Sequence, residues 1–130
     1  MVVLRERALA AKERAYAPYS NFRVGAALLG TDGGITEGCN VENASYPAGF
    51  CAERAAVAAA VSKGSRTFEM IVIATDAEEP TTPCGICRQV LVEFSPHMQV
   101  VSVTRGGREG RWSLDDLLPE AFTPQSLTRR

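Results

Sequence analysis

The sequence has almost no excess of charge of either sign. It carries 14 lysine and arginine residues against 15 aspartate and glutamate residues, a formal net charge of −1 at pH 7 over 130 residues. Proteins that bind polynucleotides neutralise phosphates with clustered Lys and Arg, so this balance argues against nucleic acid as a partner. With 45% hydrophobic and 22% charged residues, the composition is that of a folded globular protein, which argues against intrinsic disorder.

Long apolar runs are also missing. Residues 2–14 read VVLRERALAAKER, in which charges recur too often for the core of a signal peptide. No later stretch approaches the length that spans a bilayer. We therefore expect no membrane partner and a cytoplasmic location.

Internal repeats and interdomain linkers are absent from the sequence as well. A chain of this length is about the size of one ordinary domain and can bury roughly two thirds of the surface that its unfolded form exposes. We therefore expect residues 1–130 to form a single domain.

What the sequence does contain is an alternation of helical and extended patterns. Apolar residues at helical spacing predict a first helix over about residues 3–15. Two strands, 22–29 and 35–41, follow around a turn at residues 31–34. The later patterns predict a helix over 51–63, a strand over 70–75, a helix over 84–94, strands over 99–104 and 111–113, and a helix from Ser113 to Leu118. This order indicates an α/β layered domain with a mixed sheet.

The four cysteines carry the main chemical signal. Cytosolic cysteines are kept reduced, so a clustered set favours metal binding or catalysis over disulfides. The sequence places Cys51-Ala52-Glu53 ahead of Pro83-Cys84-Gly85-Ile86-Cys87. A Cys-x-Glu followed by Pro-Cys-x-x-Cys is the signature of the zinc deaminases, with Cys in place of the usual His ligand.

These residue types suit a catalytic zinc site. Cys51 and Cys84 fall at expected helix starts, where free N–H groups and the helix dipole favour thiolates. Three protein ligands leave the fourth tetrahedral position for water, which distinguishes a catalytic zinc from a structural one. We predict one Zn²⁺ per subunit, bound by Cys51, Cys84 and Cys87, and no organic cofactor.

Two further residues of this motif receive roles. Glu53 is predicted to carry protons, first from water to N3 of cytosine and then to the departing amine. Three thiolates against Zn²⁺ leave a net charge of −1, which some cation must offset. Arg54 is predicted to do so by donating hydrogen bonds to the thiolates.

Beyond these motifs, the chain closely resembles the small homotetrameric zinc-dependent cytidine deaminases. The resemblance covers most of the chain and rests on blocks in the family's order and spacing: YSNFRVGAAL at 19–28, GCNVENA at 38–44, CAER at 51–54 and PCGICRQ at 83–89. It implies a three-layer α/β/α fold with a mixed five-stranded sheet. It also implies hydrolytic deamination of free cytidine and deoxycytidine to uridine and deoxyuridine, with release of ammonia, in pyrimidine salvage.

The resemblance also implies residues that bind the substrate. Asn40 and Glu42 would bind the ribose, Phe22 would pack on the pyrimidine, and the backbone of Ala52 would help to fix the base. Each active site would be completed by neighbouring subunits of a homotetramer, with these contributors across the interface: Ala44, Tyr46 and Phe122.

Other interpretations of the same residues stay open. Cys84 and Cys87 alone are also typical of a thioredoxin-type redox pair, although that leaves Cys51 and Glu53 unexplained. A closed four-cysteine zinc site that includes Cys39 would make the chain a non-enzymatic interaction module. Among deaminases, an enzyme of blasticidin-type nucleoside antibiotics uses a similar scaffold and the same motifs, whereas a polynucleotide-editing enzyme would need a basic surface.

Overall fold

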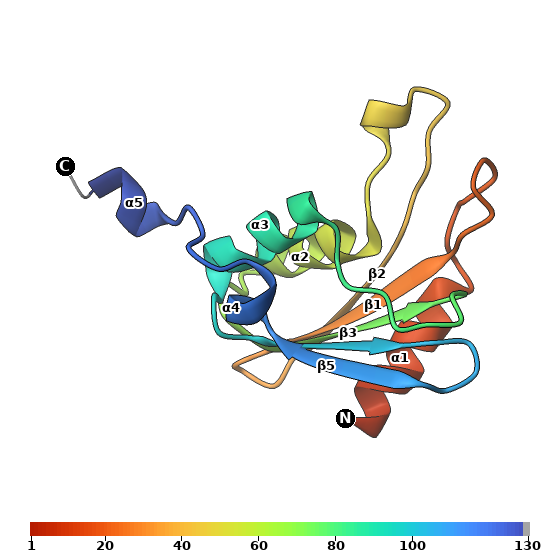
Figure 1. The fold of residues 1–130 in the computed structure, drawn as a ribbon, viewed down its shortest axis with the longest axis horizontal. Coiled ribbons are helices and arrows are strands. Elements are labelled where there is room, and N and C mark those ends of the chain that lie inside the picture. The colour runs from red at the N-terminus through yellow and green to blue at the C-terminus, as the bar shows by residue number, and fades with distance from the viewer. Residues whose placement is uncertain (129–130) are drawn as a thin grey trace.

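A mixed sheet of five strands lies at the centre of the structure, a computed structural model in which residues 1–128 are described (Figure 1). The strand order is β2-β1-β3-β4-β5. Strands β3 and β4 are parallel, whereas the other neighbouring pairs are antiparallel. The strands are β1 (Val24–Gly30), β2 (Ile35–Cys39), β3 (Phe68–Thr75), β4 (Gln99–Val103) and β5 (Glu109–Ser113).

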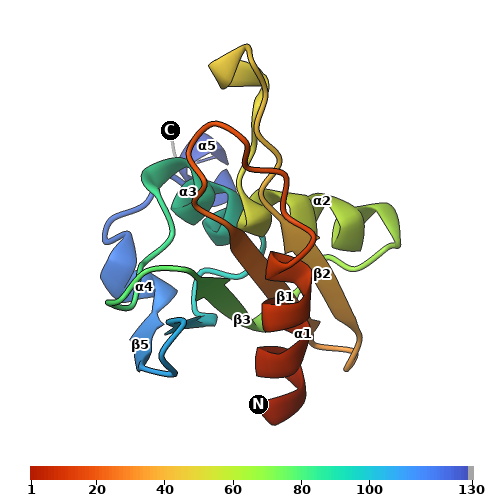
Figure 2. The same cartoon turned by 90° about the vertical axis from the view of Figure 1, so that its right-hand side faces the viewer.

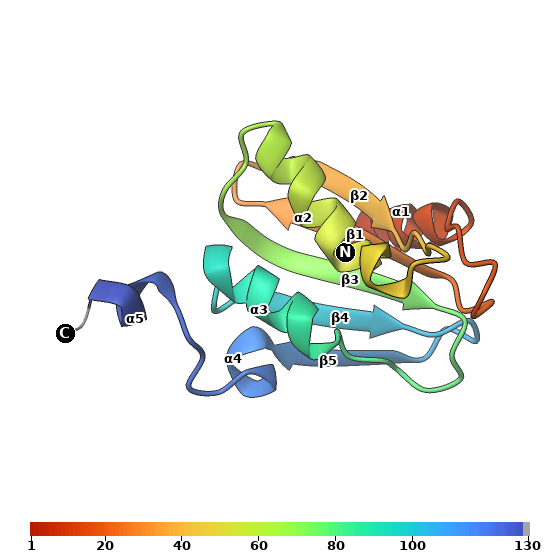
Figure 3. The same cartoon turned by 90° about the horizontal axis from the view of Figure 1, so that it is seen from above.

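Helices cover both faces of this sheet. Figure 3 shows α2 (Ala52–Ser62) and α3 (Gly85–Phe94) on one face, with α1 (Val2–Lys12) behind the sheet on the other. Successive residues of a strand face opposite sides, so Ala27 belongs to the core under α1, and Ala26 and Leu28 belong to the core under α2 and α3. The expected three-layer α/β/α fold with a mixed five-stranded sheet is confirmed.

Two glycines let the first helices approach the sheet closely. A Cβ atom on Gly25 of β1 would lie 2.2 Å from the carbonyl oxygen of Ala8 in α1. A Cβ atom on Gly38 of β2 would lie 2.5 Å from both the carbonyl oxygen of Ala52 and the nitrogen of Ala56 in α2. Any side chain at Gly38 would therefore displace the beginning of α2, which is the end of the helix next to Cys51.

The expected elements are present, but several of their boundaries are wrong. Helix α1 ends at Lys12 and not near residue 15, because the chain then turns so that the Tyr16 N–H donates to the Asn40 carbonyl. Strand β2 ends at Cys39 and not at Val41, because Val41 leaves the sheet to form bridges with Tyr16 and Phe50. Strand β1 begins two residues later than expected and β5 two residues earlier.

Two short helices were not anticipated, a 3₁₀ turn at Tyr46–Ala48 and α5 at Pro124–Thr128. Figure 1 shows the loop that carries the 3₁₀ turn rising above the sheet, and α5 standing away from the rest of the chain. The expected helix after Ser113 is α4 (Leu114–Leu117), anchored by the fully buried Leu114. Within residues 1–128, no helix has the length and apolar character needed to cross a membrane.

Candidate active site

Two helix starts meet at the edge of the sheet where β3 ends. Cys51 is the N-cap residue of α2 and Cys84 that of α3, while Cys87 lies in the first turn of α3. Figure 2 shows α2 and α3 on the same face of the sheet. Because free N–H groups and the positive end of each helix dipole face this region, both helices stabilise negative charge on the sulfur atoms.

The sulfur atoms lie close enough together to bind one metal ion. The Sγ atoms are 3.9 Å apart for Cys51 and Cys84 and 3.4 Å apart for Cys84 and Cys87, and all three fall within 4.8 Å of one another. Tetrahedral Zn–S bonds of about 2.3 Å place sulfur ligands about 3.8 Å apart. The three cysteines are therefore positioned to bind a zinc ion, and their donor set fits that metal.

Hydrogen bonds among the thiols shift the pKa values of Cys51 and Cys87 in opposite directions. A hydrogen bond from Cys87, another from Cys84 and the charge of Arg54 lower the pKa of Cys51 to about 6, although burial opposes them. The pKa of Cys87 is raised, because its thiol donates to Cys51 and because it is buried. A divalent cation takes the place of such shared protons, so metal binding would release them into solution.

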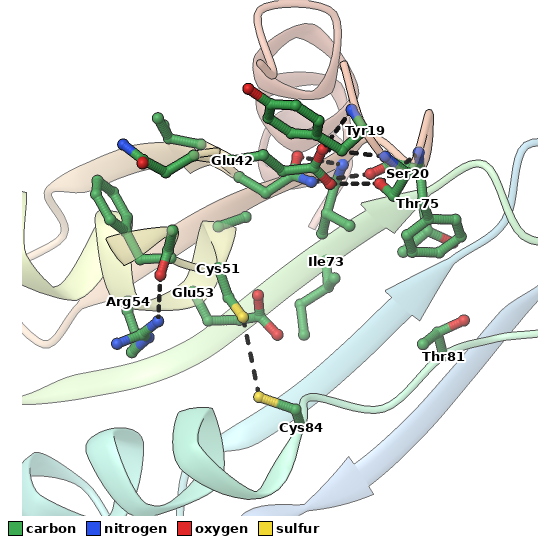
Figure 4. A pocket seen from close by; sticks show the side chains of 18 of the residues that line it. Tyr19, Ser20, Glu42, Cys51, Glu53, Arg54, Ile73, Thr75, Thr81 and Cys84 are labelled. Atoms are coloured by element: carbon green, nitrogen blue, oxygen red, sulfur yellow. Dashed lines mark hydrogen bonds between the residues drawn. The ribbon is translucent and has the colours of Figure 1, made fainter. Parts of the chain in front are cut away.

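Glu53 lies beside this cluster in the first turn of α2 and is only 5% exposed. Burial raises the pKa of Glu53 to about 7, and the negative charge of Cys51 adds to the effect. A carboxyl group with a pKa near the working pH both accepts and returns a proton readily. In Figure 4 the Glu53 carboxylate points into the cavity next to the sulfur atom of Cys51.

Arg54 approaches the cluster from the side of the preceding loop. One of its terminal nitrogens donates to the Gly49 carbonyl at 3.2 Å. Its buried Nε has no hydrogen-bond partner among residues 1–128. The predicted role of Arg54 in offsetting thiolate charge stays a prediction, and it is compatible with the charge and hydrogen bonding of Arg54, which help to lower the pKa of Cys51.

A cavity of about 580 Å³ opens above the cysteines (Figure 4). This volume is within the range of small-molecule sites. Most residues that the sequence analysis assigned to metal or substrate line it: Phe22, Asn40, Glu42, Tyr46, Cys51, Ala52, Glu53, Arg54 and Cys84. Cys87 does not line it because its side chain is fully buried. Ala44 and Phe122 do not line it either, and both are exposed on this protomer.

Asn40 and Glu42 both line the cavity. They lie beyond the end of β2, so strand alternation does not orient them. Asn40 donates to the Phe22 carbonyl and accepts from the Val24 N–H. Glu42 accepts hydrogen bonds from the backbone of Tyr19 and Ser20 and from the Ser20 hydroxyl. Both side chains therefore hold residues 19–24 in place as a wall of the cavity.

Several residues that line the cavity were missed. The Ser20 hydroxyl accepts from the Phe22 N–H while it bonds to Glu42, so one side chain joins the two predicted recognition elements. The Ser20 hydrogen bonds also lower the pKa of Glu42. Ser20 belongs to a motif block, which was the available signal. The motif blocks also contain four other missed residues, Tyr19, Val24, Val41 and Asn43. The remaining missed residues reach the cavity through tertiary folding: Gly49, Phe50, Ile73, Thr75, Thr81 and Thr82.

Fold and site together define a class of protein. A three-layer α/β/α domain brings three thiolates and one buried carboxylate to the starts of two helices, beneath a cavity of nucleoside size. This is the arrangement of the zinc-dependent deaminases, in which three ligands hold the metal and a glutamate outside the ligand set moves protons.

Comparisons with known proteins narrow this class to a family. Residues 3–104 match the family model described as the cytidine and deoxycytidylate deaminase zinc-binding region. A cytidine deaminase of Sporosarcina psychrophila is 46% identical over 119 residues, which are 91% of this chain and 88% of the relative. One of Halalkalibacterium halodurans is 43% identical over 128 residues, 96% of each chain.

A solved structure agrees with these relatives. The crystal structure of cytidine deaminase from Burkholderia pseudomallei superposes with a TM-score of 0.90 at 48% identity, covering 93% of this chain and 98% of that one. The chain belongs to the cytidine and deoxycytidylate deaminase family. The resemblance found in the sequence is thereby confirmed, and so is the zinc cofactor that it implied.

Proposed function

We propose that this protein is a zinc-dependent hydrolase that converts free cytidine and deoxycytidine to uridine and deoxyuridine, with release of ammonia, in pyrimidine salvage. One observation carries the proposal: three metal-binding thiols and a buried glutamate converge under a cavity bordered by Asn40 and Glu42. The relatives named cytidine deaminase at 43–46% identity support it.

We assign Cys51, Cys84 and Cys87 to the metal and Glu53 to proton transfer. When bound, zinc supplies a Lewis acid that makes water a nucleophile near neutral pH. Glu53 accepts the proton that the attacking water loses and delivers it to N3 of cytosine. Glu53 then accepts the second proton of that water, from the new hydroxyl at C4, and donates it to the amine as the C4–N bond breaks and the C4 carbonyl of uridine forms. Cytidine and water are thus balanced by uridine and ammonia, without any change of redox state.

We assign substrate recognition to the walls of the cavity. Phe22 packs on the pyrimidine ring, the Ala52 backbone holds the base, and Asn40 and Glu42 bind the ribose. Hydrogen bonds from Ser20 and Tyr19 keep the pKa of Glu42 low, so the ribose end of the cavity is negatively charged. Nucleosides are therefore the expected substrates, and 5′-phosphorylated forms should react poorly because a phosphate would meet this charge.

We further propose that the protein is a homotetramer whose active sites are shared. The loop that carries Ala44 and Tyr46 rises from the protomer in Figure 1, and Tyr46 is 75% exposed. Phe122 is 59% exposed on the C-terminal segment. Aromatic side chains with this exposure are typical of interfaces. We also propose that residues 1–130 form a single domain, and that the protein is cytoplasmic, where its free cysteines stay reduced.

The decisive experiment is the fall in ultraviolet absorbance when purified protein meets cytidine, run beside a zinc assay and a chelator-treated sample. Zinc-dependent conversion of cytidine to uridine is the expected result. Zinc without turnover of cytidine would favour a nucleoside antibiotic of the blasticidin type, or a purely structural metal. Protein that holds no zinc would instead revive the redox interpretation of Cys84 and Cys87. Light scattering that shows a fully active monomer would refute only the proposal that active sites are shared between subunits, and the proposed zinc chemistry would stand.

A further inference from the structure

The Arg88 guanidinium joins two distant segments of the chain at the start of α3. Its Nε donates to the Pro83 carbonyl at 2.7 Å, and one terminal nitrogen donates to the Thr82 hydroxyl at 2.8 Å. The other terminal nitrogen donates to the Leu117 carbonyl at 2.8 Å. Two of these acceptors immediately precede Cys84, while the third belongs to α4.

Cys84 is the most exposed of the three metal ligands, although the preceding Pro83 is buried and the Thr81 N–H donates to the Ser102 hydroxyl. By contrast, Cys87 is fully buried within α3. Cys51 follows Phe50, which forms a backbone bridge with Val41. Cys84 instead ends the connection from β3 to α3, residues 76–84, which contains no helix or strand. The position of its sulfur atom therefore depends on what holds residues 82 and 83.

The third acceptor, the Leu117 carbonyl, connects the Arg88 guanidinium to the core of the domain. Leu117 is in α4, which is anchored in the core by the fully buried Leu114. Figure 3 shows α4 beside α3, on the side of α3 away from α2. A guanidinium that bonded only to residues 82 and 83 would follow any movement of their loop. Because Arg88 also bonds to α4, it ties that loop to the core of the domain.

We propose that Arg88 is a positioning residue that holds Cys84 in the geometry required to bind zinc. This inference rests on the proposed zinc site. Arg88 has no assigned contact with metal or substrate and acts through the backbone on either side of the ligand. The planar guanidinium suits this task because its nitrogens donate in separate fixed directions, which a lysine ammonium does not reproduce. Partners that orient metal ligands typically change metal affinity 10–100-fold when they are lost.

The test is the zinc dissociation constant of the full-length protein, measured by competition with a chromophoric chelator. Arg88→Met should weaken zinc binding about 10–100-fold. Arg88→Lys should stay close to Arg88→Met, and Thr82→Val, which removes one of three acceptors, should cause a smaller loss. Arg66→Met is the matched control, because it removes a guanidinium bond to the Val61 carbonyl in the last turn of α2, at the end of that helix away from Cys51. Its zinc affinity should equal that of the parent protein.

A merely structural role for Arg88 would give a different result. Arg88→Met would then lower the melting temperature of the metal-free protein but leave zinc affinity unchanged, which would overturn the inference. If Arg88→Met does not fold, unchanged zinc affinity in both Arg88→Lys and Thr82→Val would overturn it equally. These outcomes leave the proposed function intact, provided that the parent protein binds zinc and deaminates cytidine. A parent protein without zinc would refute the proposed function first, and this inference with it.

Discussion

Replacement of Gly38 by alanine tests whether the close contact between β2 and α2 positions the metal site. The new Cβ would lie 2.5 Å from the Ala52 carbonyl oxygen and 2.5 Å from the Ala56 nitrogen. Relief to an ordinary carbon–oxygen contact of about 3.3 Å requires a movement of about 0.8 Å. Since both clashing atoms belong to the helix backbone, the first turns of α2 must move, and Cys51 with them.

The expected cost follows from this displacement. Overpacking of a core contact costs about 1–3 kcal/mol in the free energy of unfolding, or about 4–12 °C in melting temperature for a chain of this size. Metal–ligand distances tolerate only about 0.2 Å, so Gly38→Ala should also weaken zinc binding. Both quantities are measured at one protomer concentration, the first by thermal unfolding of metal-free protein and the second by chelator competition.

Two other glycines provide matched controls. Gly25→Ala places a Cβ 2.2 Å from the Ala8 carbonyl oxygen in α1, on the opposite face of the sheet. It should lower stability to a similar extent but leave zinc affinity unchanged. A Cβ on Gly106 would meet no atom within 4 Å among residues 1–128, its own chain neighbours aside, and Gly106→Ala should change neither quantity for the worse. Unchanged melting temperature and zinc affinity in Gly38→Ala would refute the reasoning.

Three further outcomes are expected. Glu53→Gln should retain zinc but lower kcat by at least about a hundredfold, because an amide cannot carry the proton; near-normal turnover would remove Glu53 from the mechanism. Burial of Asp76 is outweighed by hydrogen bonds from Lys12 and Arg23, which hold the pKa of this carboxyl at about 2, below the ordinary value of 3.8. The charged Asp76 carboxylate therefore contributes its full share of the free energy of unfolding above about pH 4, and this contribution is lost as the pH falls toward 2. We expect the contribution to be about 1 kcal/mol after solvent screening, since the side chain is 15% exposed. Asp76→Asn should flatten acid unfolding in this range, and an identical pH profile would contradict the assignment. Chelation should abolish activity and lower apparent stability by about 4 kcal/mol when free zinc had stood a thousandfold above Kd; added zinc should restore both, and stability indifferent to zinc would count against the site.

The sequence singled out the three cysteines that the structure positions to bind a metal, because the local structure around each of them is evident from short motifs. Cys51 and Cys84 each precede a helix whose alanine-rich or apolar pattern is evident from a few residues. Glu53 follows from the same motif. A short motif at a helix start defines both the direction of its side chains and the charge that they meet, so little tertiary information was needed.

Long-range contacts explain what the sequence did not predict. The end of β2 depends on Val41 pairing with Phe50 and Tyr16, which no property of residues 35–41 reveals. Asn40 and Glu42 reach the cavity through bonds to residues 19–24 and not through strand alternation. Arg88 similarly bonds to Leu117, which is 29 residues away in the chain.

The separation of two metal ligands along the chain has a consequence for unfolding kinetics. Cys51 and Cys84 are 33 residues apart, and the segment between them contains β3, which pairs with both β1 and β4. A zinc ion that binds both cysteines turns the segment between them into a closed loop, and the central strand of the sheet is part of that loop. If that strand unfolds while zinc stays bound, the unfolded segment remains a closed loop, which has less conformational entropy than a free chain and so disfavours unfolding. Two variants of equal stability without metal should accordingly be inactivated at different speeds if they retained zinc differently.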